Sequence, residues 1–112
     1  MLVFSPAAPL TFINAEYIAG ELDKALATAG GVRLVVIEAS GITLIDYTGA
    51  RTMIATIVRL RERGIDVVLA RLESTRAAGA ARRGGLLEAL GEGHVFHSVE
   101  EAVQALGPQP AA

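Results

Sequence analysis

The chain has 112 residues, a formal net charge of −2 and no cysteine. This length supports one domain, and a chain that is 52% hydrophobic and 20% charged is not disordered as a whole. The lack of cysteine excludes disulfides, thiolate zinc sites, iron–sulfur clusters and a cysteine nucleophile. No run of 18 apolar residues is present, so the sequence predicts no segment that spans a bilayer by itself.

The charges are unevenly distributed along the chain. Eight arginines and four acids lie between residues 51 and 91, whereas the parts on either side are acidic. The middle part can therefore present a basic face to anions or acidic partners. The plainer interpretation is that these arginines are solvated helix positions. The acidic overall balance and the lack of aromatics between the basic residues argue against nucleic-acid binding.

The first third of the chain predicts two strands and a helix. Residues 2–4 and 10–13 are short apolar runs on either side of a turn with two prolines, which is typical of an edge or a hairpin. Asn14 has the side chain of an N-cap, and apolar residues then recur at helical spacing. The glycine pair at 30–31 is expected to end this helix.

The middle of the chain predicts strands alternating with helices. Residues 32–37 form a nearly unbroken apolar run, which is typical of a strand buried on both faces. A second helix is expected from about residue 50 to Gly64, followed by a buried strand at 65–70. A third helix is expected from Ser74 to about residue 83, with one or two further turns before Gly91.

The end of the chain predicts a short strand at 94–97 and a last helix. That helix begins with a capping box, in which Ser98 is the N-cap and Glu101 the third helical residue. The order of elements predicts an α/β fold with a mixed, mostly parallel sheet of four to five strands and about four helices. We expect one domain over residues 1–107 and a flexible tail at 108–112.

The start of the second helix is the most informative stretch for chemistry. Asp46 and Thr48 both have side-chain oxygens that can accept from free backbone N–H groups there, and Gly49 allows close approach of another backbone. A phosphate on Thr48 would lie at the favourable end of the helix dipole. No phosphate-binding loop and no Rossmann glycine pattern is present. The two histidines, His94 and His97, have no acid cluster beside them that would indicate a metal site.

Several segments, taken in order, resemble a STAS domain, the fold shared by sulfate-transporter C-terminal domains and anti-sigma factor antagonists. The resemblance covers about residues 2–106, and no single segment is diagnostic. The fold that this resemblance implies agrees with the alternation of strands and helices predicted above. The segments that carry the resemblance are residues 32–37, 38–50, 60–65, 85–91, 95–96 and 98–103.

The anti-sigma antagonist branch of this family has Asp-Ser-Ser-Gly at the start of the second helix, and a partner kinase phosphorylates the second serine. Here the segment is Asp46-Tyr47-Thr48-Gly49. The resemblance therefore implies that Thr48 occupies the phosphoacceptor position and that Asp46 matches the acid before it. Tyr47 departs from the family pattern.

The SulP-type anion transporter branch has a Pro-Leu-aromatic-aromatic-x-Asn-Ala segment near the start of its STAS domain. Residues 9–16, Pro-Leu-Thr-Phe-Ile-Asn-Ala-Glu, are similar, with Thr11 in place of the first aromatic. This resemblance implies a regulatory and interaction domain without catalytic activity or cofactor, on the cytoplasmic side of a membrane. It also implies that these residues are a fragment of a larger transporter chain.

The resemblance implies partners of several kinds. The first is the transmembrane domain of the same transporter chain or another protein, and the alternative is a kinase-type anti-sigma factor bound by a free-standing antagonist. The expected contact region comprises Asp46, Tyr47, Thr48, Gly49 and Arg51. A nucleotide or small anion, held by Arg51 or by Arg82 and Arg83, and a dimer of the chain also remain open. No enzyme is expected, since no residue pair has the spacing of an acid–base dyad.

Overall fold

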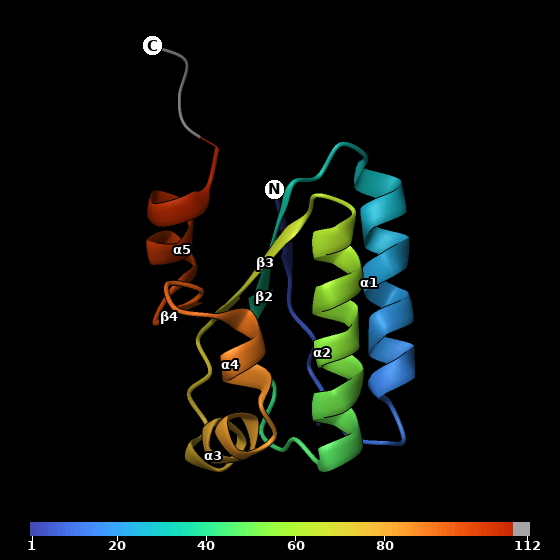
Figure 1. Ribbon diagram of the computed structural model, residues 1–112, viewed down its shortest axis with the longest axis vertical. Helices are drawn as coiled ribbons and strands as arrows, with labels where there is room; N and C mark the ends of the chain where they lie inside the picture. Colours follow the sequence, from blue (N-terminus) through green and yellow to red (C-terminus); the bar gives the residue numbers. More distant parts are fainter. Residues whose placement is uncertain (109–112) are drawn as a thin grey trace.

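The computed structural model describes residues 1–108, which form a four-stranded sheet and five helices (Figure 1). The predicted tail at 108–112 lies outside the described residues except for Pro108. The α/β class predicted from the sequence is confirmed. In chain order the elements are β1 (Leu2–Phe4), α1 (Ala15–Ala29), β2 (Leu34–Glu38), α2 (Tyr47–Glu62), β3 (Asp66–Ala70), α3 (Thr75–Arg83), α4 (Leu86–Leu90), β4 (Val95–Phe96) and α5 (Val99–Leu106).

The sheet has the strand order β1-β2-β3-β4, and all strand pairs among the described residues are parallel. In the register, Val35 of β2 lies between Leu2 of β1 and Val67 of β3. Parallel neighbours require crossover connections, which the helices between consecutive strands provide. The helix count is five because α3 and α4 are separate helices. Gly85 lies between them with φ of 82°, a left-handed conformation that interrupts the helix.

The second strand predicted at residues 10–13 is wrong. Only Leu10 pairs there, in an isolated parallel bridge with Ile45. The residues after it turn instead, because the side chain of Asn14 accepts from the backbone N–H of Thr11 at 3.0 Å. The backbone N–H of Ala15 then donates to the carbonyl oxygen of Thr11 at 2.8 Å, which leads directly into α1. Local hydrogen bonds thus replace the predicted strand ladder.

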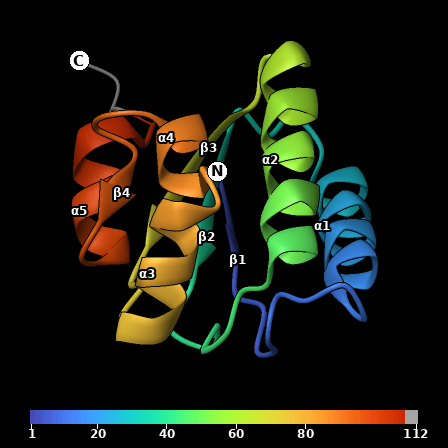
Figure 2. The same cartoon turned by 60° about the horizontal axis from the view of Figure 1, so that its bottom comes forward.

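Helices cover the two faces of the sheet unequally. Alternate residues of β2 and β3 point to opposite faces, and one set, which includes Val35 and Leu69, packs under α1, α2, α3 and α4. The other set, which includes Val36 and Val68, packs against α5 alone. Figure 2 shows α5 on one side of the sheet and α1 and α2 on the other.

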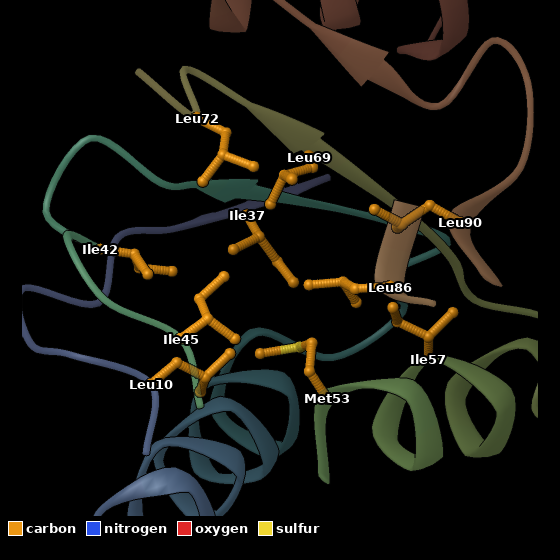
Figure 3. A pocket seen from close by; sticks show the side chains of 10 residues that line it. All are labelled: Leu10, Ile37, Ile42, Ile45, Met53, Ile57, Leu69, Leu72, Leu86 and Leu90. Carbon is orange, nitrogen blue, oxygen red and sulfur yellow. The ribbon is translucent and has the colours of Figure 1, made fainter. Parts of the chain in front are cut away.

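The larger core is filled by aliphatic side chains rather than by a ligand cavity. Figure 3 shows them converging from the sheet, from α2 and α4, and from the loops before α1 and α2. The space left between them is only about 10 Å³, which is about the minimum for one water molecule. This cavity is therefore too small for a ligand. The side chains in Figure 3 are Leu10, Ile37, Ile42, Ile45, Met53, Ile57, Leu69, Leu72, Leu86 and Leu90.

Candidate interaction site at the start of helix α2

Two loops meet at the edge of the sheet where the strands end. The loop between β1 and α1 is joined to the loop between β2 and α2 by two backbone hydrogen bonds. The N–H of Leu10 donates to the carbonyl oxygen of Leu44 at 2.8 Å, and the N–H of Asp46 donates to the carbonyl oxygen of Leu10 at 3.1 Å. Sites in parallel α/β sheets gather at this edge. The two loops therefore act as one surface.

Asp46 is the N-cap of α2, and both oxygens of its carboxylate are used. Oδ1 accepts from the N–H of Gly49 at 2.7 Å, and Oδ2 accepts from the N–H of Phe12 in the other loop at 3.0 Å. The first bond satisfies a free N–H of the helix terminus, and the second fixes the β1–α1 loop. Asp46 is thus a structural clamp between the two loops.

Gly49 is required by the close packing of these loops. A Cβ added at this position would overlap the carbonyl group of Leu10. The glycine therefore allows the β1–α1 loop to lie directly on the first turn of α2. Asp46 and Gly49 position the site from beneath, since neither presents a free functional group to solvent.

The residues between this clamp and the glycine point outward. Tyr47 is 75% exposed, and Thr48 is also exposed as the second residue of α2, so Thr48 does not cap the helix. Phe12 and Ile13 of the neighbouring loop are 68% and 79% exposed. Tyr17, in the first turn of α1, is 69% exposed. We use the name aromatic patch for these four exposed residues, Phe12, Ile13, Tyr17 and Tyr47. Ile13 is aliphatic, and Tyr47 and Tyr17 line separate hollows.

Part of this patch could be recognised from the sequence, because Tyr17 does not follow the spacing of the buried residues of α1. Ala15, Ile18, Leu22 and Leu26 are the buried residues of α1, and Tyr17 falls outside their stripe. Phe12 and Ile13 belong to the segment 10–13, for which the sequence predicts a strand. Once that strand is replaced by a turn, their apolar side chains have no core to enter.

The arginines considered for anion binding do not converge on one pocket. Arg83 lines a hollow of about 260 Å³ beside Asp46 and Tyr47, at the start of α2. Arg51 lines a different groove, between α1 and α2. Arg82 is exposed and lines neither of these two hollows. The structure therefore places Arg51 and Arg83 on separate surfaces.

Two further polar groups near strand ends are engaged in the fold. Glu38, at the end of β2, accepts from the N–H of Ser40 at 2.9 Å. The Ser40 hydrogen bonds and the charge of Arg71 hold the pKa of Glu38 below its ordinary value despite partial burial. His94 contacts the carboxylate of Asp66 at 2.9 Å. Within residues 1–108 no group of three or more His, Asp or Glu side chains is arranged to hold a metal ion.

A four-stranded parallel sheet with capped helices and an exposed loop surface defines the class as a small α/β domain. The family model of the STAS domain matches residues 1–102. The chain therefore belongs to the STAS domain family, as its sequence segments indicated. Comparison with curated proteins gives no match.

Solved structures agree with this assignment. A sulfate transporter family protein from Wolinella succinogenes has 25% identity and a TM-score of 0.73, over 92% of this chain and 82% of that one. The STAS domain of a SulP transporter from Vibrio cholerae has 20% identity and a TM-score of 0.72, over 93% of this chain and 79% of that one. The chain also resembles part of the murine Slc26a9 anion transporter, with 21% identity and a TM-score of 0.77. That match covers 92% of this chain and 17% of the transporter.

No helix in the described part of the chain combines the length and the apolar character that crossing a bilayer requires.

Proposed function

We propose that this chain is a non-catalytic regulatory and interaction domain of a SulP-type anion transporter, acting on the cytoplasmic side of the membrane. The observation that carries this proposal is the aromatic patch at the start of α1 and α2. The similarity to transporter STAS domains supports the choice of transporter. The murine match, of which this chain covers only 17%, is an anion transporter much longer than this chain.

The patch has the properties of a contact surface. Three of the five aromatic side chains of the protein lie in it, all more than two-thirds exposed. Exposed aromatic side chains grouped on one surface are typical of sites that another protein covers, because burying them removes apolar area from water. The Asp46 clamp fixes the loop that carries Phe12, so less conformational entropy is lost on binding. The partner that we propose is the transmembrane part of the transporter.

The anti-sigma antagonist alternative assigns a kinase-type partner to the same surface. Thr48 is exposed beside Tyr47, and a phosphate there would add about −1.5 to −2 charges to the patch. The similar structures named above are those of transporter proteins, so we do not adopt this alternative. Incubation with cognate kinases and ATP, followed by mass spectrometry, tests whether Thr48 is modified.

Anion uptake by cells that express the complete transporter tests the proposal. We expect the double variant F12S/Y47S to change the initial rate of uptake several-fold while the folded domain and its membrane level stay as in the native protein. Val95→Ser is the matched control, because Val95 is 44% exposed on β4, outside the patch. Native uptake in the double variant, or a coding sequence without a multi-span membrane segment, would contradict the proposal.

A further inference from the structure

A groove runs between α1 and α2 on the side that faces solvent. It has a volume of about 700 Å³, and its walls are the two helices, which lie side by side (Figure 1). Small residues form the floor of the groove and so leave space above them. They are Ala19, Gly20 and Ala55. The aromatic patch does not contribute to this groove, so the two surfaces are distinct.

The glycine in this groove has no explanation within the chain. Gly20 lies in the middle of α1, where glycine is less favourable than alanine. A Cβ added at Gly20 would meet no atom within 4 Å, in contrast to the overlap that a Cβ at Gly49 would cause. A glycine that packing inside the protein does not require fits a position where a second backbone approaches from outside.

The charges on the walls of the groove are of opposite sign. Glu16 and Asp23 line it from α1, and Arg51 and Arg59 line it from α2. Arg59 binds Asp23 at 3.0 Å across the groove. Among the described residues, the side chains of Glu16 and Arg51 make no ion pair or hydrogen bond, although both line the same groove.

The charged residues of α1 and α2 lie at matching positions along the two helix axes. Glu16 lies seven residues before Asp23, and Arg51 lies eight residues before Arg59. At about 1.5 Å per residue, Glu16 and Arg51 are therefore at nearly the same level, since Asp23 and Arg59 are in contact. Figure 1 shows that α1 and α2 run in the same direction, with their N-terminal ends at the bottom.

This arrangement is complementary to itself. A two-fold axis along the groove places α1 of one copy over α2 of the other, with all four helices in the same direction. The unpaired Glu16 of each copy then faces the unpaired Arg51 of the second copy at the same height. A surface that matches itself under a two-fold axis is the requirement for an isologous dimer. A helix of an unrelated protein would fit in the same way only if its own charges matched the acidic residues of α1 and the arginines of α2.

We propose that the α1–α2 groove is a self-association surface, occupied by the same groove of a second copy of this chain. The small side chains on the floor allow the helices of the two copies to approach closely. The pairs formed by Glu16 and Arg51 set the alignment of the copies. This inference is independent of the proposed transporter function, because it uses none of the residues of the aromatic patch.

Sedimentation equilibrium of the 112-residue chain tests the proposal. We expect a monomer–dimer equilibrium whose dissociation constant rises with salt. Gly20→Leu should raise that constant at least about tenfold, because the side chain fills the groove. The fold should be retained, since the added Cβ meets no atom of the same chain. Ala105→Leu, at an exposed position of α5, is the control and should leave the constant unchanged.

A charge swap tests the pairing itself. Glu16→Arg and Arg51→Glu should each weaken the dimer several-fold, and the double variant should return the dissociation constant to within about threefold of native. A monomer at every concentration up to the solubility limit would overturn the proposal. A dimer that Gly20→Leu does not weaken, or one that the double variant fails to restore, would also overturn it. A monomer that holds another protein in this groove would assign the surface to that protein instead.

Discussion

Two glycines within helices occupy opposite environments. Gly49 lies in the first turn of α2 against the backbone of Leu10, whereas Gly20 lies in the middle of α1 facing open space. Neither has a left-handed backbone conformation, so a Cβ at either position causes no backbone strain. Adding one methyl group at Gly49 therefore tests steric overlap, whereas adding one at Gly20 tests helix propensity.

Alanine substitution at the two positions should have effects of opposite sign. Gly49→Ala should lower the free energy of unfolding by at least about 2 kcal/mol, because the Cβ forces the β1–α1 loop away from α2. Gly20→Ala should raise the stability of the monomer by about 0.5–1 kcal/mol through helix propensity alone. Urea denaturation at low protein concentration measures both. Equal stabilities for the two variants would show that the Leu10 contact is not tight.

The contact between α2, β3 and α4 depends on one arginine. Arg61 donates to the carbonyl oxygens of Ala89 and Leu90 at 2.8 and 2.7 Å, and so satisfies free groups at the end of α4. It also donates to the carbonyl oxygen of Val67 at 3.0 Å and pairs with Asp66 at 3.2 Å. The planar guanidinium provides these donors from one position, which lysine cannot do. Arg61 therefore joins three elements.

Arg61→Ala should destabilise the fold by about 2–4 kcal/mol, since several charge-assisted hydrogen bonds are lost together. Arg61→Lys should recover less than half of this loss. Arg63→Ala is the control, because Arg63 is exposed just after α2 and its side chain makes no described hydrogen bond. Chemical denaturation of the three variants gives the comparison. A loss in Arg61→Ala no larger than in Arg63→Ala would contradict the assignment.

The segment before β4 is attached to the start of β3 through His94. Its Nε2 lies 2.9 Å from Asp66 Oδ2, and its Nδ1 lies 3.0 Å from the carbonyl oxygen of Glu92. Both partners of the ring are therefore oxygen atoms. Burial raises the pKa of Asp66, but the hydrogen bonds from His94 and Val67 and the charges of His94 and Arg61 outweigh it. The pKa of this carboxyl is therefore below its ordinary value.

This shift predicts how stability depends on acid. A carboxyl whose pKa is lowered by folding stabilises the protein above the pKa that it has when unfolded, about 3.9. That contribution is lost as the pH falls through the lower, folded pKa. Asp66→Asn should thus be less stable than native at pH 7, and the difference should narrow below about pH 4. Urea denaturation from pH 7 to 3 tests this, with Glu92→Gln as the control; a constant difference would contradict it.

At the scale of the whole molecule, the order of elements was predictable from hydrophobic periodicity and turn residues. The buried strands β2 and β3 and the caps Asp46, Ser74 and Ser98 follow from local patterns that their neighbours reinforce. The strand predicted at 10–13 is wrong because apolar residues can form either a strand or an exposed turn, and composition does not distinguish them. The turn is formed by specific hydrogen bonds, from the N–H of Thr11 to Asn14, from the N–H of Ala15 to Thr11 and from the N–H of Phe12 to Asp46, which apolar composition does not reveal.

The candidate site was predictable only in part. Asp46 and Gly49 were expected at a helix start, and the structure adds why both are needed, through contacts with Phe12 and Leu10 in another loop. Such contacts join residues more than thirty positions apart, so spacing along the chain does not reveal them. The same holds for Arg61, which resembles a solvated helix arginine until α4 is placed against it.

The central claim is that the aromatic patch contacts the membrane part of a transporter, and photo-crosslinking from the patch tests it most directly. A benzophenone side chain at position 47, in cells that make the complete protein, should give a covalent product with a multi-span membrane segment. The same group at Gln104, exposed on α5, should not give that product. Equal products from both positions, or a product between position 47 and a kinase-type anti-sigma factor, would contradict the claim.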